Sequence, residues 1–62
     1  MNAAPIRVLI ADDQESIRSA FRLILDAQPD IQVIGEAADG ATAAELARHL
    51  KPDVVLAGLS RP

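Results

Sequence analysis

Three short apolar runs alternate along the chain with two segments that repeat apolar residues at helical spacing. The runs Ile6–Ala11, Ile31–Glu36 and Asp53–Ala57 are rich in β-branched residues. Near-continuous apolar runs of this length are typical of strands buried on both faces of a parallel sheet. The segments between them predict helices over 14–27 and 41–50. The order β-α-β-α-β therefore predicts an α/β fold.

Each predicted helix has one apolar stripe and a proline that ends it. The stripe of the first helix consists of Ile17, Ala20, Phe21, Ile24 and Leu25. The stripe of the second consists of Ala43, Leu46, Ala47 and Leu50. Pro29 and Pro52 end the two helices, and Asp39 is a suitable N-cap for the second. We expect the single aromatic residue, Phe21, to lie in the core.

The connections between the strands predict the topology of the sheet. Right-handed crossovers on either side of the first strand give a parallel sheet in the order 2-1-3, with the helices on opposite faces. Two helices cannot cover both faces of such a sheet well, and at least one strand edge stays open. We therefore expect residues 1–5 to form a flexible lead and residues 6–62 to form half of a doubly wound domain, which can self-associate through the open edge.

Composition excludes several classes of protein. The 62 residues are 50% apolar and 24% charged, with a net charge of −3, no cysteine and one histidine. Disulfides, thiolate zinc sites and sites with several histidines are excluded. There is no basic stripe for nucleic acid, no run long enough to cross a membrane and no signal-peptide pattern. We expect no membrane association and a cytoplasmic location.

Adjacent acids follow the first predicted strand. Ligand sites of open parallel sheets form at the carboxyl ends of the strands, where Asp12 and Asp13 stand. Two neighbouring carboxylates repel each other, and Mg²⁺, which prefers oxygen ligands, would relieve that repulsion. Two solvated acids at a helix N-terminus are the alternative interpretation. The pair alone leaves both open.

Four separated motifs together resemble a known family. They are IRVLIADD over Ile6–Asp13, the pair Ile17–Arg18, PDIQVIGEAADG over Pro29–Gly40 and LKPDVVLAGLSRP over Leu50–Pro62. In this order and spacing they resemble the first half of a bacterial response-regulator receiver domain, in the subfamily with a helix-turn-helix DNA-binding output domain. The resemblance implies an incomplete flavodoxin-like receiver fold and a role in phosphorelay signal transduction and transcription regulation. It also implies that DNA is bound only through an output domain absent from this chain.

The resemblance also implies roles for particular residues. The implied Mg²⁺ ligands are Asp13 directly, Asp12 largely through water, and the backbone carbonyl of Ser60. The implied docking surface for a sensor histidine kinase consists of Gln14, Glu15, Arg18 and Arg22. Pro62 matches the proline that shapes the loop after the third strand.

One position departs from the family pattern. The family places its phospho-acceptor aspartate at the end of the third strand, and this chain has Gly58 there. Glycine has no carboxylate to form an acyl phosphate. Asp53 cannot replace it, because it lies at the opposite end of the strand, about 16 Å away at ~3.3 Å per residue. We therefore expect a fragment that is not an enzyme and cannot accept phosphate, with a weak or vestigial Mg²⁺ site.

Two other interpretations stay open at the level of sequence. The chain can be a cut-down piece of a full-length response-regulator transcription factor. In a different class, it can be half of a small phosphate- or nucleotide-binding enzyme with flavodoxin-like strand order. The absence of a Gly-rich phosphate loop and of a nucleophile argues against the enzyme.

Overall fold

The computed structural model describes residues 4–58, which contain five elements in the predicted order. They are β1 (Ile6–Ala11), α1 (Glu15–Asp26), β2 (Ile31–Ala37), α2 (Gly40–Leu50) and β3 (Val54–Ala57). Every boundary lies within one residue of its prediction. Ser60, Pro62 and residues 1–3 of the expected lead lie outside the described residues.

The three strands form one parallel sheet in the order β2-β1-β3. This confirms the predicted topology. The central strand is the most buried element, and Leu9 and Ile10 have no exposed surface. An apolar strand in the middle of a parallel sheet is covered on both faces, which explains why β1 has the longest uninterrupted apolar run.

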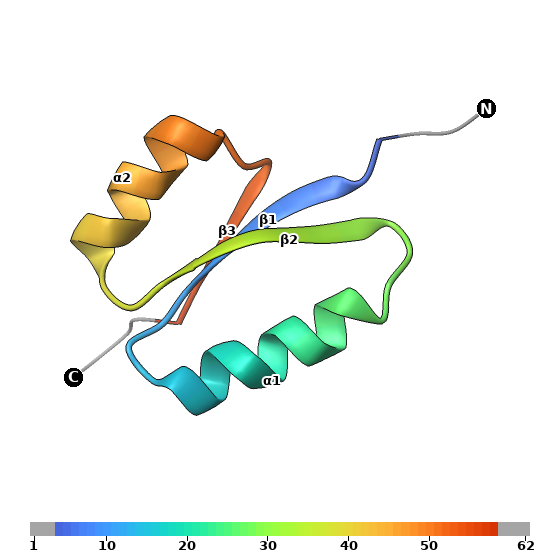
Figure 1. Ribbon diagram of the computed structural model, residues 1–62, viewed down its shortest axis with the longest axis horizontal. Helices are drawn as coiled ribbons and strands as arrows, with labels where there is room; N and C mark the ends of the chain where they lie inside the picture. Colours follow the sequence, from blue (N-terminus) through green and yellow to red (C-terminus); the bar gives the residue numbers. More distant parts are fainter. Residues whose placement is uncertain (1–3, 59–62) are drawn as a thin grey trace.

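The two helices cover opposite faces of the sheet (Figure 1), as predicted, and both pack against β1 and β2. On the α2 face, Ala43 packs with Ala11 and Ala37, and Leu46 lies against this group. These small side chains let the helix approach the sheet closely. In the predicted α2 stripe, Ala43 is therefore buried, and Leu46, Ala47 and Leu50 are half-buried.

The α1 face is covered less completely. Phe21 and Leu25 are half-buried, whereas Ile17 is exposed and 59% of Ile24 is accessible. The expectation that Phe21 lies in the core is therefore only partly met. A sheet of three strands is too narrow to bury the whole apolar stripe of α1, so one side of the stripe stays open.

A β-bulge in β2 changes the face of the sheet to which its last side chains point. Val8 pairs with Val33 and Leu9 pairs with Gly35, so the intervening Ile34 has no partner in β1. Regular alternation would place Glu36 on the face opposite Val33. After the bulge, Glu36 pairs with Ile10 and shares the α1 face with Val33. Gly35 and Ala37 consequently face α2.

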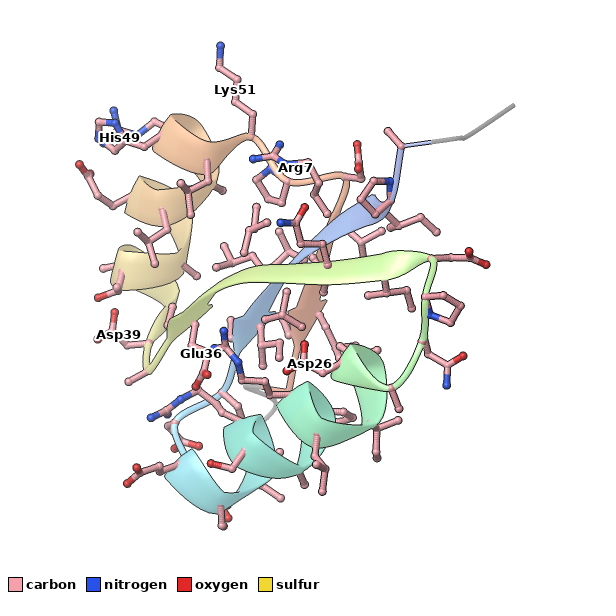
Figure 2. The ribbon with its side chains drawn as sticks, turned by 45° about the vertical axis from the view of Figure 1, so that its right-hand side comes forward. Arg7, Asp26, Glu36, Asp39, His49 and Lys51 are labelled. Carbon is pink, nitrogen blue, oxygen red and sulfur yellow. The ribbon has the colours of Figure 1, made fainter. Side chains whose placement is uncertain are left out.

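Strand β3 is held to β1 at both of its ends. At its start, the Asp53 amide donates to the Arg7 carbonyl at 2.8 Å, and the Arg7 amide donates to the Asp53 carboxylate at 2.9 Å. At its end, the Gly58 amide donates to the Ala11 carbonyl at 2.8 Å. The Arg7 side chain also donates to the carbonyl of Lys51, which ends α2 with a left-handed backbone (φ 52°). Figure 2 shows Arg7 and Lys51 at this end of the molecule.

The outer side of β3 lacks a neighbour among residues 4–58. Val54 and Val55, which point to opposite faces of the sheet, are 46% and 44% exposed. Among the described residues, β3 is therefore one open edge of the sheet, and β2 forms the other edge. Neither α1 nor α2 is long and apolar enough to cross a membrane.

Candidate functional site

The carboxyl ends of the three strands meet at one edge of the sheet. The amide of Asp12, which follows β1, donates to the carbonyl of Ala37 at the end of β2 at 3.0 Å. The amide of Gly58, which follows β3, donates to the carbonyl of Ala11. The sequence predicted a site at this edge, and the structure brings Asp12, Asp13 and Gly58 together there.

The two adjacent acids have different surroundings. Asp12 is 5% exposed, and its Oδ1 accepts a hydrogen bond of 2.8 Å from the Gln14 amide. Asp13 is exposed. Asp12 therefore fixes the turn between β1 and α1, and Asp13 is the member of the pair that is accessible to solvent.

Gly58 lies directly beside Asp12. A Cβ atom built on Gly58 would stand 2.3 Å from the Asp12 Oδ2. The space that a side chain at position 58 would enter is thus occupied by the Asp12 carboxylate. Asp53 lies at the other end of β3, where its carboxylate accepts from the Arg7 amide.

The described part of this edge is an incomplete set of ligands for Mg²⁺. Residues 4–58 contain no group of three metal-ligating side chains. One Asp12 oxygen is bonded to Gln14, and the third predicted ligand, Ser60, lies outside the described residues. Mg²⁺ requires nearly octahedral oxygen coordination. Two carboxylates, one of them almost buried, meet that requirement only in part.

An ion-pair network joins this edge to α1. Arg18 donates through Nη1 to the Asp12 carbonyl at 2.7 Å and through Nε to Glu36 Oε1 at 3.2 Å. Arg22 pairs with the other Glu36 oxygen. Figure 2 shows Glu36 between the end of β2 and α1. The hydrogen bond from Arg22, and then that from Arg18, lowers the pKa of Glu36 against the opposing effect of partial burial.

The predicted kinase-docking residues divide into two groups. Gln14 and Glu15 are exposed at the start of α1. Arg18 and Arg22 are paired with Glu36. Glu36 is not among the residues predicted for the site, and strict alternation in β2 would place it on the face away from α1. The Gly35–Glu36 pair near the end of the strand was the available signal.

The first turn of α2 has the predicted cap. The side chain of Asp39 accepts a hydrogen bond of 2.7 Å from the Thr42 amide. Hydrogen bonding to Thr42 also lowers the pKa of Asp39. This cap fixes the start of α2 immediately after the strand end that contacts Asp12.

Comparison with known families agrees with this geometry. The family model described as the response regulator receiver domain matches residues 8–60. The chain belongs to the response regulator receiver family. The crystal structure of the response regulator domain of Thermotoga maritima CheB has a TM-score of 0.81 and 43% identity to this receiver segment. The match covers 90% of this chain and 46% of that chain, which confirms the incomplete flavodoxin-like fold.

Relatives of this receiver segment include transcriptional regulators and an enzyme. The transcriptional regulatory protein LiaR of Bacillus subtilis is 54% identical over 54 residues, which are 87% of this chain and 26% of LiaR. The nitrate/nitrite response regulator protein NarL of Escherichia coli K12 is 38% identical over 61 residues, 98% of this chain and 28% of NarL. A protein-glutamate methylesterase/protein-glutamine glutaminase of Thermotoga maritima is 46% identical over 57 residues, 92% of this chain and 17% of that protein. The chain thus spans between 17% and 28% of the length of these relatives.

Proposed function

We propose that this chain is a receiver segment that does not accept a phosphoryl group and acts by binding. The observation that carries this proposal is Gly58, which stands at the carboxyl end of β3 beside Asp12. An acyl phosphate forms only on a carboxylate. Position 58 supplies none, and Asp12 is nearly buried with one oxygen bonded to Gln14.

We propose a weak Mg²⁺ site made of Asp12, Asp13 and the Ser60 carbonyl. The exposed Asp13 supports it as the direct ligand. Bound Mg²⁺ would supply positive charge beside the acidic pair. Two unit charges ~4 Å apart attract each other by about 4 kcal/mol at an effective dielectric near 20. Without a carboxylate at position 58, the site loses attraction of this size for the metal ion. The affinity expected for this site is therefore millimolar or weaker.

The proposed surface for a sensor histidine kinase extends from Gln14, the N-cap of α1, along the polar side of that helix to Arg22. Gln14 and Glu15 are exposed there and supply polar contacts. Arg18 and Arg22 flank them while remaining paired with Glu36. In this proposal the two arginines fix the orientation of the docking surface as well as its charge.

We propose that residues 6–62 are the receiver part of a cytoplasmic transcription factor and that residues 1–5 are a flexible lead. The similarity to LiaR and NarL supports this assignment. In such a parent protein, DNA is bound by an output domain outside this segment. The methylesterase relative matches over only 17% of its length, so its enzymatic activity is not proposed for this chain.

Incubation with acetyl phosphate and Mg²⁺, followed by intact-mass measurement, tests the proposed function. The mass should stay unchanged, because position 58 offers no nucleophile. A hydroxylamine-sensitive phosphate on the unaltered chain, at Asp12, Asp13 or any other residue, would refute the proposal.

A further inference from the structure

The space beside Gly58 differs from that beside the other two glycines. A Cβ built on Gly40 has no neighbour within 4 Å, and one on Gly35 has neighbours at 3.3 Å. A Cβ built on Gly58 lies 2.3 Å from Asp12 Oδ2 and 3.4 Å from Asp12 Cγ. Backbone strain is not the reason for glycine at position 58, because no described glycine has a positive φ. The obstacle is the Asp12 carboxylate alone.

Asp12 is fixed in this inward position by several contacts. Its Oδ1 accepts a hydrogen bond from the Gln14 amide, and its own amide donates a hydrogen bond to the Ala37 carbonyl. Its carbonyl accepts from Arg18. The carboxylate therefore cannot leave the space beside Gly58 without losing the bond to Gln14, which satisfies an amide at the start of α1.

We propose that Asp12 and Gly58 form a coupled pair, in which the missing side chain at position 58 lets Asp12 turn inward and cap the turn between β1 and α1. Any residue with a Cβ at position 58 displaces the Asp12 carboxylate and releases the Gln14 amide. Gly58 is thus a positioning residue that acts through Asp12. This proposal uses residues of the same site as the proposed function, but its test follows the Gln14 amide and unfolding, so it can fail separately from the phosphorylation test.

Gly58→Ala and Asp12→Ala, alone and together, test the coupling. In Gly58→Ala we expect the Gln14 amide to exchange about ten-fold faster and the unfolding equilibrium constant to rise by a similar factor, as for loss of a hydrogen bond to a charged group. In the Asp12→Ala background the nearest remaining atom to the new methyl group is the Cβ of residue 12, at 4.0 Å, an ordinary contact. Gly58→Ala should then be neutral or slightly stabilising, because alanine restricts the unfolded chain.

Gly40→Ala is the matched control, because its new methyl group enters open space. It should leave Gln14 exchange unchanged. If Gly58→Ala alone fails to fold while Gly58→Ala with Asp12→Ala folds, the coupling is supported. The proposal is overturned if Gly58→Ala leaves Gln14 exchange unchanged, or if it has the same effect on unfolding with and without Asp12.

Discussion

The carboxylate of Glu36 binds two arginine side chains of α1, and this makes the stability of the molecule depend on pH. The folded-state pKa of Glu36 lies below its ordinary value of 4.5, chiefly because of Arg22 and then Arg18. A group with a lowered folded pKa stabilises the protein above its unfolded pKa. That contribution is lost as the pH falls through the folded pKa. Glu36 therefore makes its full contribution to the free energy of unfolding near neutral pH and a progressively smaller one below about pH 4.5.

Glu36→Gln should remove this contribution. We expect the free energy of unfolding at pH 7 to fall by about 1 kcal/mol, a value reduced for the partial exposure of the pair. The variant should also lose less stability than the unaltered protein between about pH 5 and pH 3. Urea unfolding over this pH range measures both effects.

Glu45→Gln serves as the control for this prediction. Glu45 pairs with Arg48 and His49 on an exposed face of α2, and exposed pairs of this kind contribute little. Its substitution should leave the pH dependence of unfolding nearly unchanged. Identical pH profiles for Glu36→Gln and the unaltered protein would show that the network with Arg18 and Arg22 does not stabilise the fold.

Individual residues could be predicted where one local signal decided their role. Gly58 was found because it departs from a motif, and Asp39 because a cap needs only its own helix. The inward turn of Asp12 could not be predicted, since it depends on contacts with Gln14 and with the end of β3. The pairing of Arg18 with Glu36 likewise depends on two elements that are separate in the sequence.

At the scale of elements, the contact between α2 and β2 depends on a glycine. A Cβ built on Gly35 would lie 3.3 Å from the Leu50 Cδ1 of α2 and 3.3 Å from the Leu9 Cδ1 of β1. These distances are tighter than most Cβ contacts. A side chain here has to push the end of α2 away from the sheet.

Gly35→Val should therefore destabilise the fold by about 1–3 kcal/mol through overpacking. The same substitution at Gly40, in open space at the first turn of α2, should have little effect or stabilise the helix slightly. Urea unfolding of the two variants makes the comparison. Equal stabilities would mean that Leu50 and Leu9 move aside at little cost.

The bounds of the elements were predictable within one residue because strong local signals set them. Pro29 and Pro52 end the helical patterns, and near-continuous apolar runs define the strands. The bulge at Ile34 was not predictable, because the alternation rule assumes a regular ladder. That single irregularity places Glu36 on the α1 face, beside Arg18 and Arg22.

At the scale of the whole molecule, the open edge of β3 governs assembly. Val54 and Val55 are nearly half exposed on opposite faces, and the strand contains no charged residue or proline. Such an edge offers unpaired backbone groups to another chain. The topology was predictable from handedness and strand order, and the exposure of β3 follows from it.

The isolated chain should therefore be partly unfolded or self-associated at micromolar concentration. Sedimentation together with amide exchange of β3 checks this expectation. Val55→Lys, which places a charge on the edge strand, should reduce association. A monodisperse monomer with strongly protected β3 amides would contradict the prediction.

The bulge in β2 determines which single residue of this strand can be deleted without disturbing the sheet. Because Ile34 has no partner in β1, deleting it leaves the pairs of Val33 with Val8 and of Gly35 with Leu9 in place. Deleting Gly35 instead moves Ile34 opposite Leu9, into space where even a methyl group is tight. Two adjacent deletions of equal length thus have opposite outcomes. Length variation in this strand is compatible with the fold at one position and not at the next.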